Sequence, residues 1–178
     1  MMYLHEDRST FAEILSMASD TYGISGEIAE KDYYVSMLLK ELHNIEPKFV
    51  FRGGTSLSKC YHVIERFSED IDLSLMPNIN HMTEGMKRNL KEQIFTAVQN
   101  MGLLISNPED IRSRRDFNRY VAAYNSIYDQ AMISHDIVIE TFIAIRPFPV
   151  IKKPVNTYIQ QILLNAGQDK LIKSYGLE

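Results

Sequence analysis

Two long stretches near the N-terminus and one in the middle of the chain carry apolar residues at the three- and four-residue spacing of amphipathic helices. The first stretch follows Thr10-x-x-Glu13, which has the form of a capping box, and it ends at Gly23. The second covers residues 27–43 and the third covers residues 83–101. The pattern therefore predicts three helices of substantial length.

Shorter apolar stretches predict the strands of a sheet. Residues 135–145 are nearly all apolar and β-branched, which predicts a central strand buried on both faces. In residues 70–75, apolar and polar residues alternate, as on a strand with one apolar and one acidic face. The other predicted elements are strands over residues 48–52, 103–106 and 119–124, and helices over residues 55–66, 156–164 and the last ten positions.

The order of these elements indicates the fold class. Helices come first, and strands and helices then mix, which predicts an α+β fold: a mixed β-sheet with the N-terminal helices packed on it. The 178 residues are enough to bury a substantial core, so we expect a single domain over residues 1–178.

Composition and charge narrow the range of functions. Hydrophobic residues make up 45% of the chain and charged residues 24%, as in a soluble globular protein, and no run of 18 apolar residues predicts a membrane span. The N-terminus does not have the form of a signal peptide, and the single cysteine, Cys60, fits a reducing cytoplasm and a buried structural thiol. The net charge of −4 argues against a generic nucleic-acid binder but leaves room for a local basic patch.

The first candidate site is the segment Phe-Arg-Gly-Gly-Thr-Ser-Leu-Ser-Lys at residues 51–59, which has the form of a strand, a Gly-Gly turn and a helix. Glycine permits a positive φ and a close approach of a ligand to the backbone. The N–H groups and the dipole at the start of the helix suit a phosphate. The expected phosphate-binding residues are Gly53, Gly54, Thr55, Ser56 and Lys59. The alternative is an ordinary strand-turn-helix with Thr55 as its N-cap.

The second candidate site is a pair of aspartates, Asp70 and Asp72, two positions apart on the predicted strand. This spacing places both carboxylates on one face, where they repel unless a cation lies between them. Mg²⁺ suits this position because it is usually held by one or two carboxylates together with substrate phosphates. The alternative is a solvated polar face of a strand.

Glu140 is the third candidate, because it is an acid within an otherwise apolar strand. A buried carboxylate without a partner is costly, so either an Arg or Lys pairs with it or it joins Asp70 and Asp72 as a third metal ligand or a base. Three such carboxylates could hold Mg²⁺ ions at the attacking and leaving oxygens of an in-line displacement on a nucleoside triphosphate. The residues therefore indicate a nucleotidyltransferase.

Two other patterns lead to different interpretations. Asp70-Ile-Asp-Leu-Ser74 resembles the Asp-x-Asp-x-Ser/Thr signature of haloacid-dehalogenase-like phosphatases, but in that family an apolar strand precedes the nucleophilic Asp, and residues 65–69 cannot form such a strand. A basic stretch could contact a nucleic-acid backbone or a triphosphate, or it could be a solvated loop with ordinary salt bridges. It consists of Arg112, Arg114, Arg115 and Arg119, with Phe117 and Tyr120.

Taken together, residues 53–59 and residues 66–73 (Arg-Phe-Ser-Glu-Asp-Ile-Asp-Leu) resemble the AbiEii/AbiGii toxin family of nucleotidyltransferases. Further matches are residues 30–35 (Glu-Lys-Asp-Tyr-Tyr-Val) and Ile139-Glu140. The resemblance implies a DNA polymerase β-like fold, binding of an NTP with Mg²⁺, and a bacterial, cytoplasmic toxin that has an antitoxin partner. It also implies that tRNA is a possible acceptor.

The resemblance assigns roles to individual positions. Gly53, Gly54, Thr55 and Ser56 would hold the triphosphate, and Ser68 belongs to the same nucleotide-binding motifs. The metal ligands would be Asp70, Asp72 and Glu140. Members of the family continue with a helix that bears Lys and Arg, followed by another Asp, whereas this chain ends at Glu178. We therefore expect it to lack the usual C-terminal helical part.

Three functions remain in view from the sequence. The first is a Mg²⁺-dependent nucleotidyltransferase that transfers NMP to an acceptor. The second is a nucleotide-binding or regulatory module without catalysis, which the missing C-terminal part would favour. The third is a protein that only binds a partner within a toxin–antitoxin complex.

Overall fold

The computed structural model describes residues 2–46, 48–61, 63, 68–76, 81–128, 133–144 and 149–178. The chain divides into two compact units. One consists of Met1–Met37, Asn125–His135 and Val155–Glu178, and the other of Leu38–Tyr124 and Asp136–Pro154. The single domain predicted over residues 1–178 stays a prediction. Within the described ranges, no helix has the length and apolar composition that crossing a bilayer requires.

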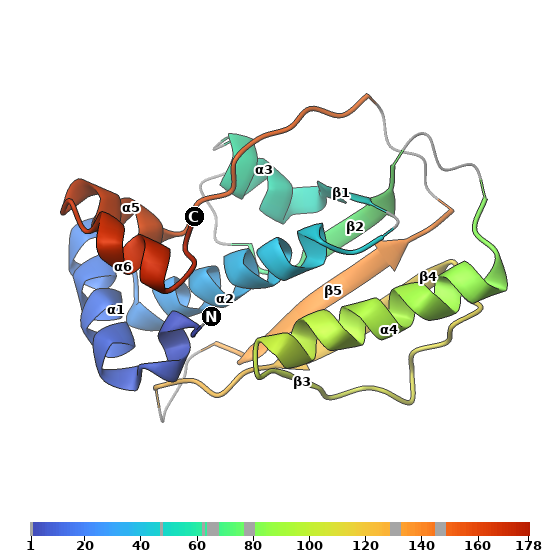
Figure 1. Cartoon of the computed structure of the whole chain (residues 1–178), viewed down its shortest axis with the longest axis horizontal. Coiled ribbons are helices and arrows are strands. Elements are labelled where there is room, and N and C mark those ends of the chain that lie inside the picture. Colours follow the sequence, from blue (N-terminus) through green and yellow to red (C-terminus); the bar gives the residue numbers. More distant parts are fainter. Residues whose placement is uncertain are drawn as a thin grey trace. The chain divides into compact units, whose positions relative to one another are not determined.

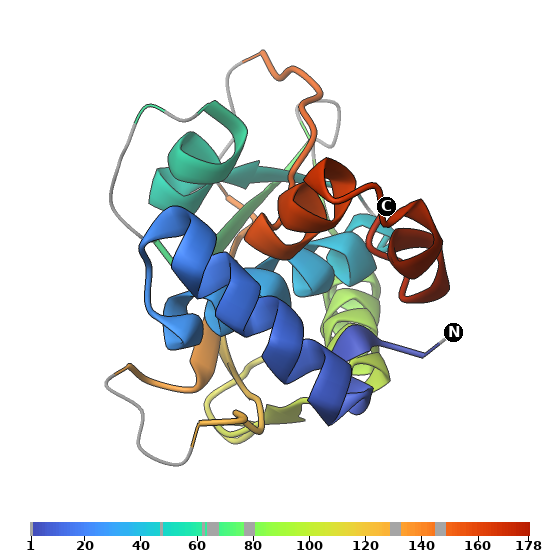
Figure 2. The same ribbon diagram turned by 90° about the vertical axis from the view of Figure 1, so that its left-hand side faces the viewer.

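The first unit is helical. It contains the short helix η1 (Leu4–Glu6), α1 (Arg8–Tyr22), most of α2 (Gly26–His43), α5 (Tyr158–Asn165) and α6 (Asp169–Ser174). Helix α5 contacts both α1 and α6 (Figure 2). The predicted N-cap of α1 is wrong, because Asp7 rather than Thr10 caps this helix and accepts the Thr10 N–H. The predicted end at Gly23 is confirmed by its left-handed backbone, with a φ of 64°.

Three consecutive charged residues of α2 hold other segments of this unit. Glu30 and Lys31 are fully buried, and Asp32 is nearly so. The Glu30 carboxylate accepts hydrogen bonds from the Ser126 hydroxyl and the Ile127 N–H at 2.5 and 2.9 Å. The other two contacts run from Lys31 Nζ to the Ser134 carbonyl at 2.8 Å and from the Tyr158 N–H to Asp32 at 3.0 Å. These residues therefore anchor the 125–135 segment and the start of α5.

The second unit is built on a five-stranded mixed sheet with the strand order β1-β2-β5-β4-β3 (Figure 1). Strand β2 pairs with β5 in parallel, and the other neighbours are antiparallel. The α+β fold with a mixed sheet is thus confirmed. The strands are β1 (Phe49–Arg52), β2 (Ile71–Leu75), β3 (Leu104–Ile105), β4 (Phe117–Ala123) and β5 (Asp136–Phe142).

Strand β5 is central, as predicted, but the prediction that it is buried on both faces is wrong. Its odd-numbered residues Ile137, Ile139 and Thr141 are fully buried, whereas the even-numbered residues between them are only partly buried. The sheet therefore has one apolar face and one face with polar and charged residues. Glu140 lies on the second face, which explains how an acid is tolerated in this strand.

Helix α4 (Glu84–Asn100) covers the apolar face of the sheet. Thr83 caps its start, and its buried residues are Leu90, Ile94, Ala97 and Val98. The Phe95 ring on α4 meets the ring of the buried Tyr120 on β4 edge to face, with centroids 6.3 Å apart. Because Tyr120 is in register with Ile139, α4 packs on the face opposite to Glu140.

Helix α3 (Gly53–Tyr61) contacts β1 and β2. It begins at Gly53, two residues earlier than predicted, so Thr55 is not its N-cap. The predicted end near Arg66 lies outside the described residues. Cys60, predicted to be buried, is only partly buried on this helix. Desolvation is the largest cause of the raised pKa of its thiol, which favours the protonated form over a nucleophilic thiolate.

Candidate active site

Four charged residues form a row across four neighbouring strands. Arg52 on β1 is the register partner of Asp72 on β2, Asp72 is the partner of Glu140 on β5, and Glu140 is the partner of Arg119 on β4. Residues in register point to the same face of a sheet, with neighbouring strands about 4.8 Å apart. We call these four residues the charged row. Two acids therefore lie side by side, with one arginine beyond each.

The arginines at the two ends of the charged row are held differently. Arg119 Nε lies 3.8 Å from Glu140 Oε1, with side chains that are 54% and 27% exposed. Glu140 thus has the cationic partner that was predicted as one alternative, and it adjoins Asp72 as well. The Arg52 guanidinium lies 4.1 Å from the centroid of the Phe142 ring. Its buried Nε has no hydrogen-bond partner in the described part of the chain.

The electrostatics of the two acids are those of a crowded anionic site. Desolvation is the main cause of the raised pKa of Asp72, which Asp70 raises further and Arg52 lowers. Desolvation also raises the pKa of Glu140, followed by the charges of Asp72 and Asp70, while Arg119 and Arg52 oppose the shift. The charge of Asp72 therefore disfavours the ionised form of Glu140, and the charge of Asp70 disfavours the ionised form of both. A bound cation would relieve this repulsion.

Gly53 connects the two sequence motifs in space. Its φ of 76° lies in the left-handed region, and a Cβ atom at this position would be 1.9 Å from Oδ2 of Asp72. Only glycine allows the Asp72 carboxylate to lie against the first residue of α3. A second link is the hydrogen bond between the hydroxyls of Thr55 and Ser68, at 2.8 Å. The predicted phosphate-binding turn and the predicted acidic pair are therefore adjacent.

The structure places the other predicted site residues as follows. Asp70 is exposed and immediately precedes β2, so of the three acids only Asp72 and Glu140 are register partners. Gly53, Gly54, Thr55 and Ser56 form the first turn of α3, in which Thr55 and Ser56 are buried. Lys59 lies in the last turn of the same helix. The roles of these residues in binding a nucleotide stay predictions.

A Mg²⁺ site of three carboxylates also stays a prediction. Across the described ranges, no three His, Cys, Asp or Glu side chains form a group that could hold a metal ion. The pair Asp72 and Glu140 nevertheless fits what Mg²⁺ takes from a protein: one or two carboxylates, with the remaining ligands from substrate phosphates and water. The raised pKa of both acids agrees with such a site.

The phosphatase interpretation gains nothing from this geometry. In that arrangement the nucleophilic aspartate follows an apolar strand, whereas here Asp70 precedes β2 and Asp72 lies within it. Residues 64–67 lie outside the described part of the chain. The position of the aspartates at the start of a strand therefore favours the nucleotidyltransferase interpretation.

Sequence reasoning missed Arg52. It stands in the first motif, directly before Gly53, but only the antiparallel register of β1 and β2 places it beside Asp72. Its only signal in the sequence is a charged residue at the end of an apolar strand. Sequence reasoning placed Arg119 in a basic stretch, whereas the structure makes it part of the charged row.

A comparison with protein families gives the family to which the chain belongs. The model of the family "Nucleotidyl transferase AbiEii toxin, Type IV TA system" matches residues 38–177. This region contains the Gly-Gly turn, both aspartates and Glu140, but it begins after the 30–35 segment that anchors the first unit. No curated protein matches the chain. Because the matched region covers most of the 178 residues, the chain belongs to the AbiEii family of nucleotidyl transferase toxins of type IV toxin–antitoxin systems.

Proposed function

We propose that this protein transfers a nucleoside monophosphate from an NTP to a nucleic-acid acceptor, in a reaction that requires Mg²⁺, and that the acceptor is tRNA. The observation that supports this most directly is the contact between the two motifs, in which Gly53 lies against the Asp72 carboxylate beside Glu140. A phosphate-binding helix start and a pair of acids at one place are what chemistry on a triphosphate requires. The family supplies the reaction class.

In this proposal the first turn of α3 binds the triphosphate. Its backbone N–H groups, starting at Gly53 and Gly54, orient the phosphates, and Lys59 adds a positive charge on the same helix. The hydrogen bond between Thr55 and Ser68 holds this turn against the segment that carries the aspartates. Most of the rate enhancement then comes from positioning and charge stabilisation.

The acids hold the metal and handle the proton. Asp72 and Glu140, with Asp70, would bind Mg²⁺, which when bound neutralises charge that develops on the phosphate oxygens. The acceptor hydroxyl forms a bond to the α-phosphorus, the bond to the bridging oxygen breaks, and pyrophosphate leaves. Where Glu140 is not itself a metal ligand, it accepts the hydroxyl proton, because its raised pKa then makes it a stronger base than an ordinary carboxylate. Arg119 pairs with Glu140, and the charge of Arg52 favours the ionised form of Asp72.

The family also implies an antitoxin partner and a nucleotide substrate. We propose that the protein acts in the bacterial cytoplasm, where such an antitoxin would restrain it. A stoichiometric partner recovered equally well by the wild type and by Asp70→Ala would support a protein contact that is separate from the acids.

The test is label transfer. The chain is incubated with Mg²⁺, total bacterial tRNA and each α-labelled NTP in turn, beside Asp72→Asn, which removes one charge at nearly constant volume. We expect label on tRNA with at least one NTP. Asp72→Asn should transfer on the order of 10²-fold less, because it removes electrostatic stabilisation of the charge that develops in the transition state. Equal labelling by Asp72→Asn would contradict the assignment of Asp72.

A second candidate is a module that binds a nucleotide without catalysis. The ion pair between Arg119 and Glu140 favours it, because an acid that already has a cationic partner need not take part in catalysis. In that case Mg²⁺ with an NTP would raise the melting temperature of the wild type and not of Asp72→Asn, while no labelled product forms. If neither a thermal shift nor a product is seen, both candidates are wrong.

A further inference from the structure

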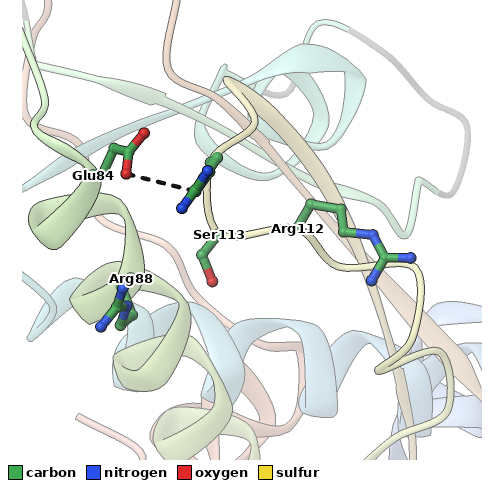
Figure 3. A pocket seen from close by; sticks show the side chains of 5 residues that line it. Glu84, Arg88, Arg112 and Ser113 are labelled. Atoms are coloured by element: carbon green, nitrogen blue, oxygen red, sulfur yellow. Dashed lines mark ion pairs between the residues drawn. The ribbon is translucent and has the colours of Figure 1, made fainter.

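A pocket of about 340 Å³ lies in the second unit between the first turns of α4 and the loop that precedes β4. Figure 3 shows Glu84 and Arg88 on the helix and Arg112 and Ser113 on the loop that passes beside it. The fifth lining residue is Arg114. We call this the arginine pocket.

The arginine pocket is positively charged on a protein that is negative as a whole. Three guanidinium groups and one carboxylate line it, whereas the chain carries a net charge of −4. The carboxylate of Glu84 lies 3.5 Å from Nε of Arg114, and both side chains are highly exposed, at 67% and 81%. Exposed pairs of this kind are weak, so Glu84 does not cancel the attraction of the site for an anion.

The loop that carries two of the arginines is held in place by its backbone. Asn118 on β4 is buried, accepts the N–H of Arg112 at 2.9 Å and donates to the carbonyl of the same residue at 3.1 Å. From α4, Lys87 Nζ donates to the Arg114 carbonyl at 3.4 Å and pairs with Asp116. The protein therefore fixes the bases of these arginine side chains while their charged ends stay at the surface.

The position of the pocket excludes a simple extension of the nucleotide site. Helix α4 packs on the apolar face of the sheet, through Phe95 and Tyr120, whereas Asp72 and Glu140 point to the other face. None of the pocket residues belongs to the charged row. A ligand that uses both places must therefore be longer than one nucleotide.

We propose that the arginine pocket binds a backbone phosphate of the acceptor nucleic acid, with Arg88, Arg112 and Arg114 as charge partners and the Ser113 hydroxyl as a further donor. Guanidinium groups suit this role because they present several N–H donors in a planar fork that matches phosphate oxygens. The inference rests on the proposed function only for the identity of the strand as the acceptor. Binding itself needs neither Mg²⁺ nor an NTP.

The test measures binding of a fluorescein-labelled 15-nucleotide oligouridylate to the full chain at 50–200 mM salt, without Mg²⁺ or NTP. Each phosphate contact to a single strand contributes a slope of about −0.7 in log K against log [salt], which corresponds to about fivefold in affinity at 0.1 M. We expect the double variant Arg88→Ala/Arg112→Ala to weaken binding about fivefold and to reduce the slope by about 0.7, and each single variant to show a measurable part of this loss. Glu84→Gln should tighten binding, because it removes the one opposing charge.

Arg115→Ala is the matched control, because Arg115 belongs to the same loop but does not line the pocket. It should leave the slope unchanged. Equal effects of Arg115→Ala and Arg88→Ala would overturn the proposal, since charge in the loop rather than the pocket would then decide binding. The proposal is also overturned if inorganic phosphate or ATP protects the wild type, but not Arg88→Ala, in a melt while oligonucleotide binding is the same for both.

The catalytic proposal can fail separately. Asp72→Asn should bind the oligonucleotide as the wild type does, because Asp72 points to the other face of the sheet. Absence of label transfer together with pocket-dependent binding would contradict the proposed reaction and support the binding site. Label transfer that is insensitive to Arg88→Ala and Arg112→Ala at subsaturating tRNA would contradict the role of the pocket in holding the acceptor.

Discussion

Replacing Gly53 by alanine tests the link between the two motifs most directly. Gly53 combines a φ of 76° with a position at which a Cβ atom would meet Oδ2 of Asp72 at 1.9 Å. The substitution therefore has two effects: a backbone penalty at residue 53 and a forced movement of the Asp72 carboxylate. Gly102→Ala is a matched variant that separates them. Gly102 has a φ of 68°, but a Cβ atom at its position would meet no other described atom within 4 Å.

The magnitudes follow from the geometry. A left-handed backbone destabilises a non-glycine residue by about 1–2 kcal/mol, so both Gly53→Ala and Gly102→Ala should lower the free energy of unfolding by about this amount. Only Gly53→Ala also requires the carboxylate to retreat by about 1.5 Å, the difference between 1.9 Å and an ordinary contact of 3.4 Å. Misplacement of a catalytic group by about 1 Å can reduce the rate on the order of 10²-fold.

The assay combines urea unfolding with label transfer under conditions in which both variants are folded. We expect similar losses of stability, a loss of transfer of about 10²-fold for Gly53→Ala, and wild-type transfer per folded molecule for Gly102→Ala. The thermal shift with Mg²⁺ and NTP gives a second readout that does not depend on turnover, and it should shrink only for Gly53→Ala. Wild-type transfer and thermal shift by Gly53→Ala would refute the reasoning that the Asp72 carboxylate needs the space at Gly53.

Three further predictions concern pH and buried polar contacts. Desolvation of Glu30 outweighs its hydrogen bonds and raises its pKa above the ordinary 4.5, so the unfolded chain releases this proton first as pH rises. The stability of the wild type relative to Glu30→Gln should therefore fall as the pH rises above about 4.5, and a constant difference in urea unfolding would contradict this. The raised pKa of Asp72 and Glu140 means that protons compete with Mg²⁺ for these carboxylates. The thermal shift caused by Mg²⁺ should therefore be smaller at pH 5 than at pH 7.5, and it should be absent in Asp72→Asn. A thermal shift that does not depend on pH would argue against metal binding by these acids. Asn118→Ala should destabilise the protein by about 1–3 kcal/mol, because it removes both hydrogen bonds between the buried Asn118 side chain and the Arg112 backbone. It should also weaken oligonucleotide binding, and unchanged stability in chemical denaturation would contradict this.

Local patterns predicted the elements well where the relevant forces are local. Helix α2 begins one residue before its predicted start and ends where predicted, and the central strand β5 lies within the predicted residues 135–145, because periodic burial of apolar side chains is visible in the order of residues. The cap at Thr10 failed because Asp7 offers a carboxylate to the same turn and starts the helix earlier. The prediction that β5 is buried on both faces was wrong, because its β-branched residues fit a half-buried strand as well as a fully buried one.

The role of residues 30–32 could not be read from their order. Three consecutive charges on a helix indicate a solvated surface, yet all three are buried, and two hold a chain segment about 100 positions away. Burial of charge is tolerated only where hydrogen bonds compensate for lost hydration. The partners, Ser126, Ile127, Ser134 and Tyr158, meet α2 only in the folded chain.

The amino-acid order by itself determined the α+β class, the Gly-Gly turn and the three acids, since glycine and carboxylate carry their chemical properties wherever they stand. Tertiary structure alone decided that Gly53 touches Asp72, that Glu140 is the neighbour of Asp72, and that Arg52 and Arg119 complete the row. The reason is physical: strand register depends on hydrogen bonds between segments far apart in the chain, and a shift of one residue would turn every side chain to the other face.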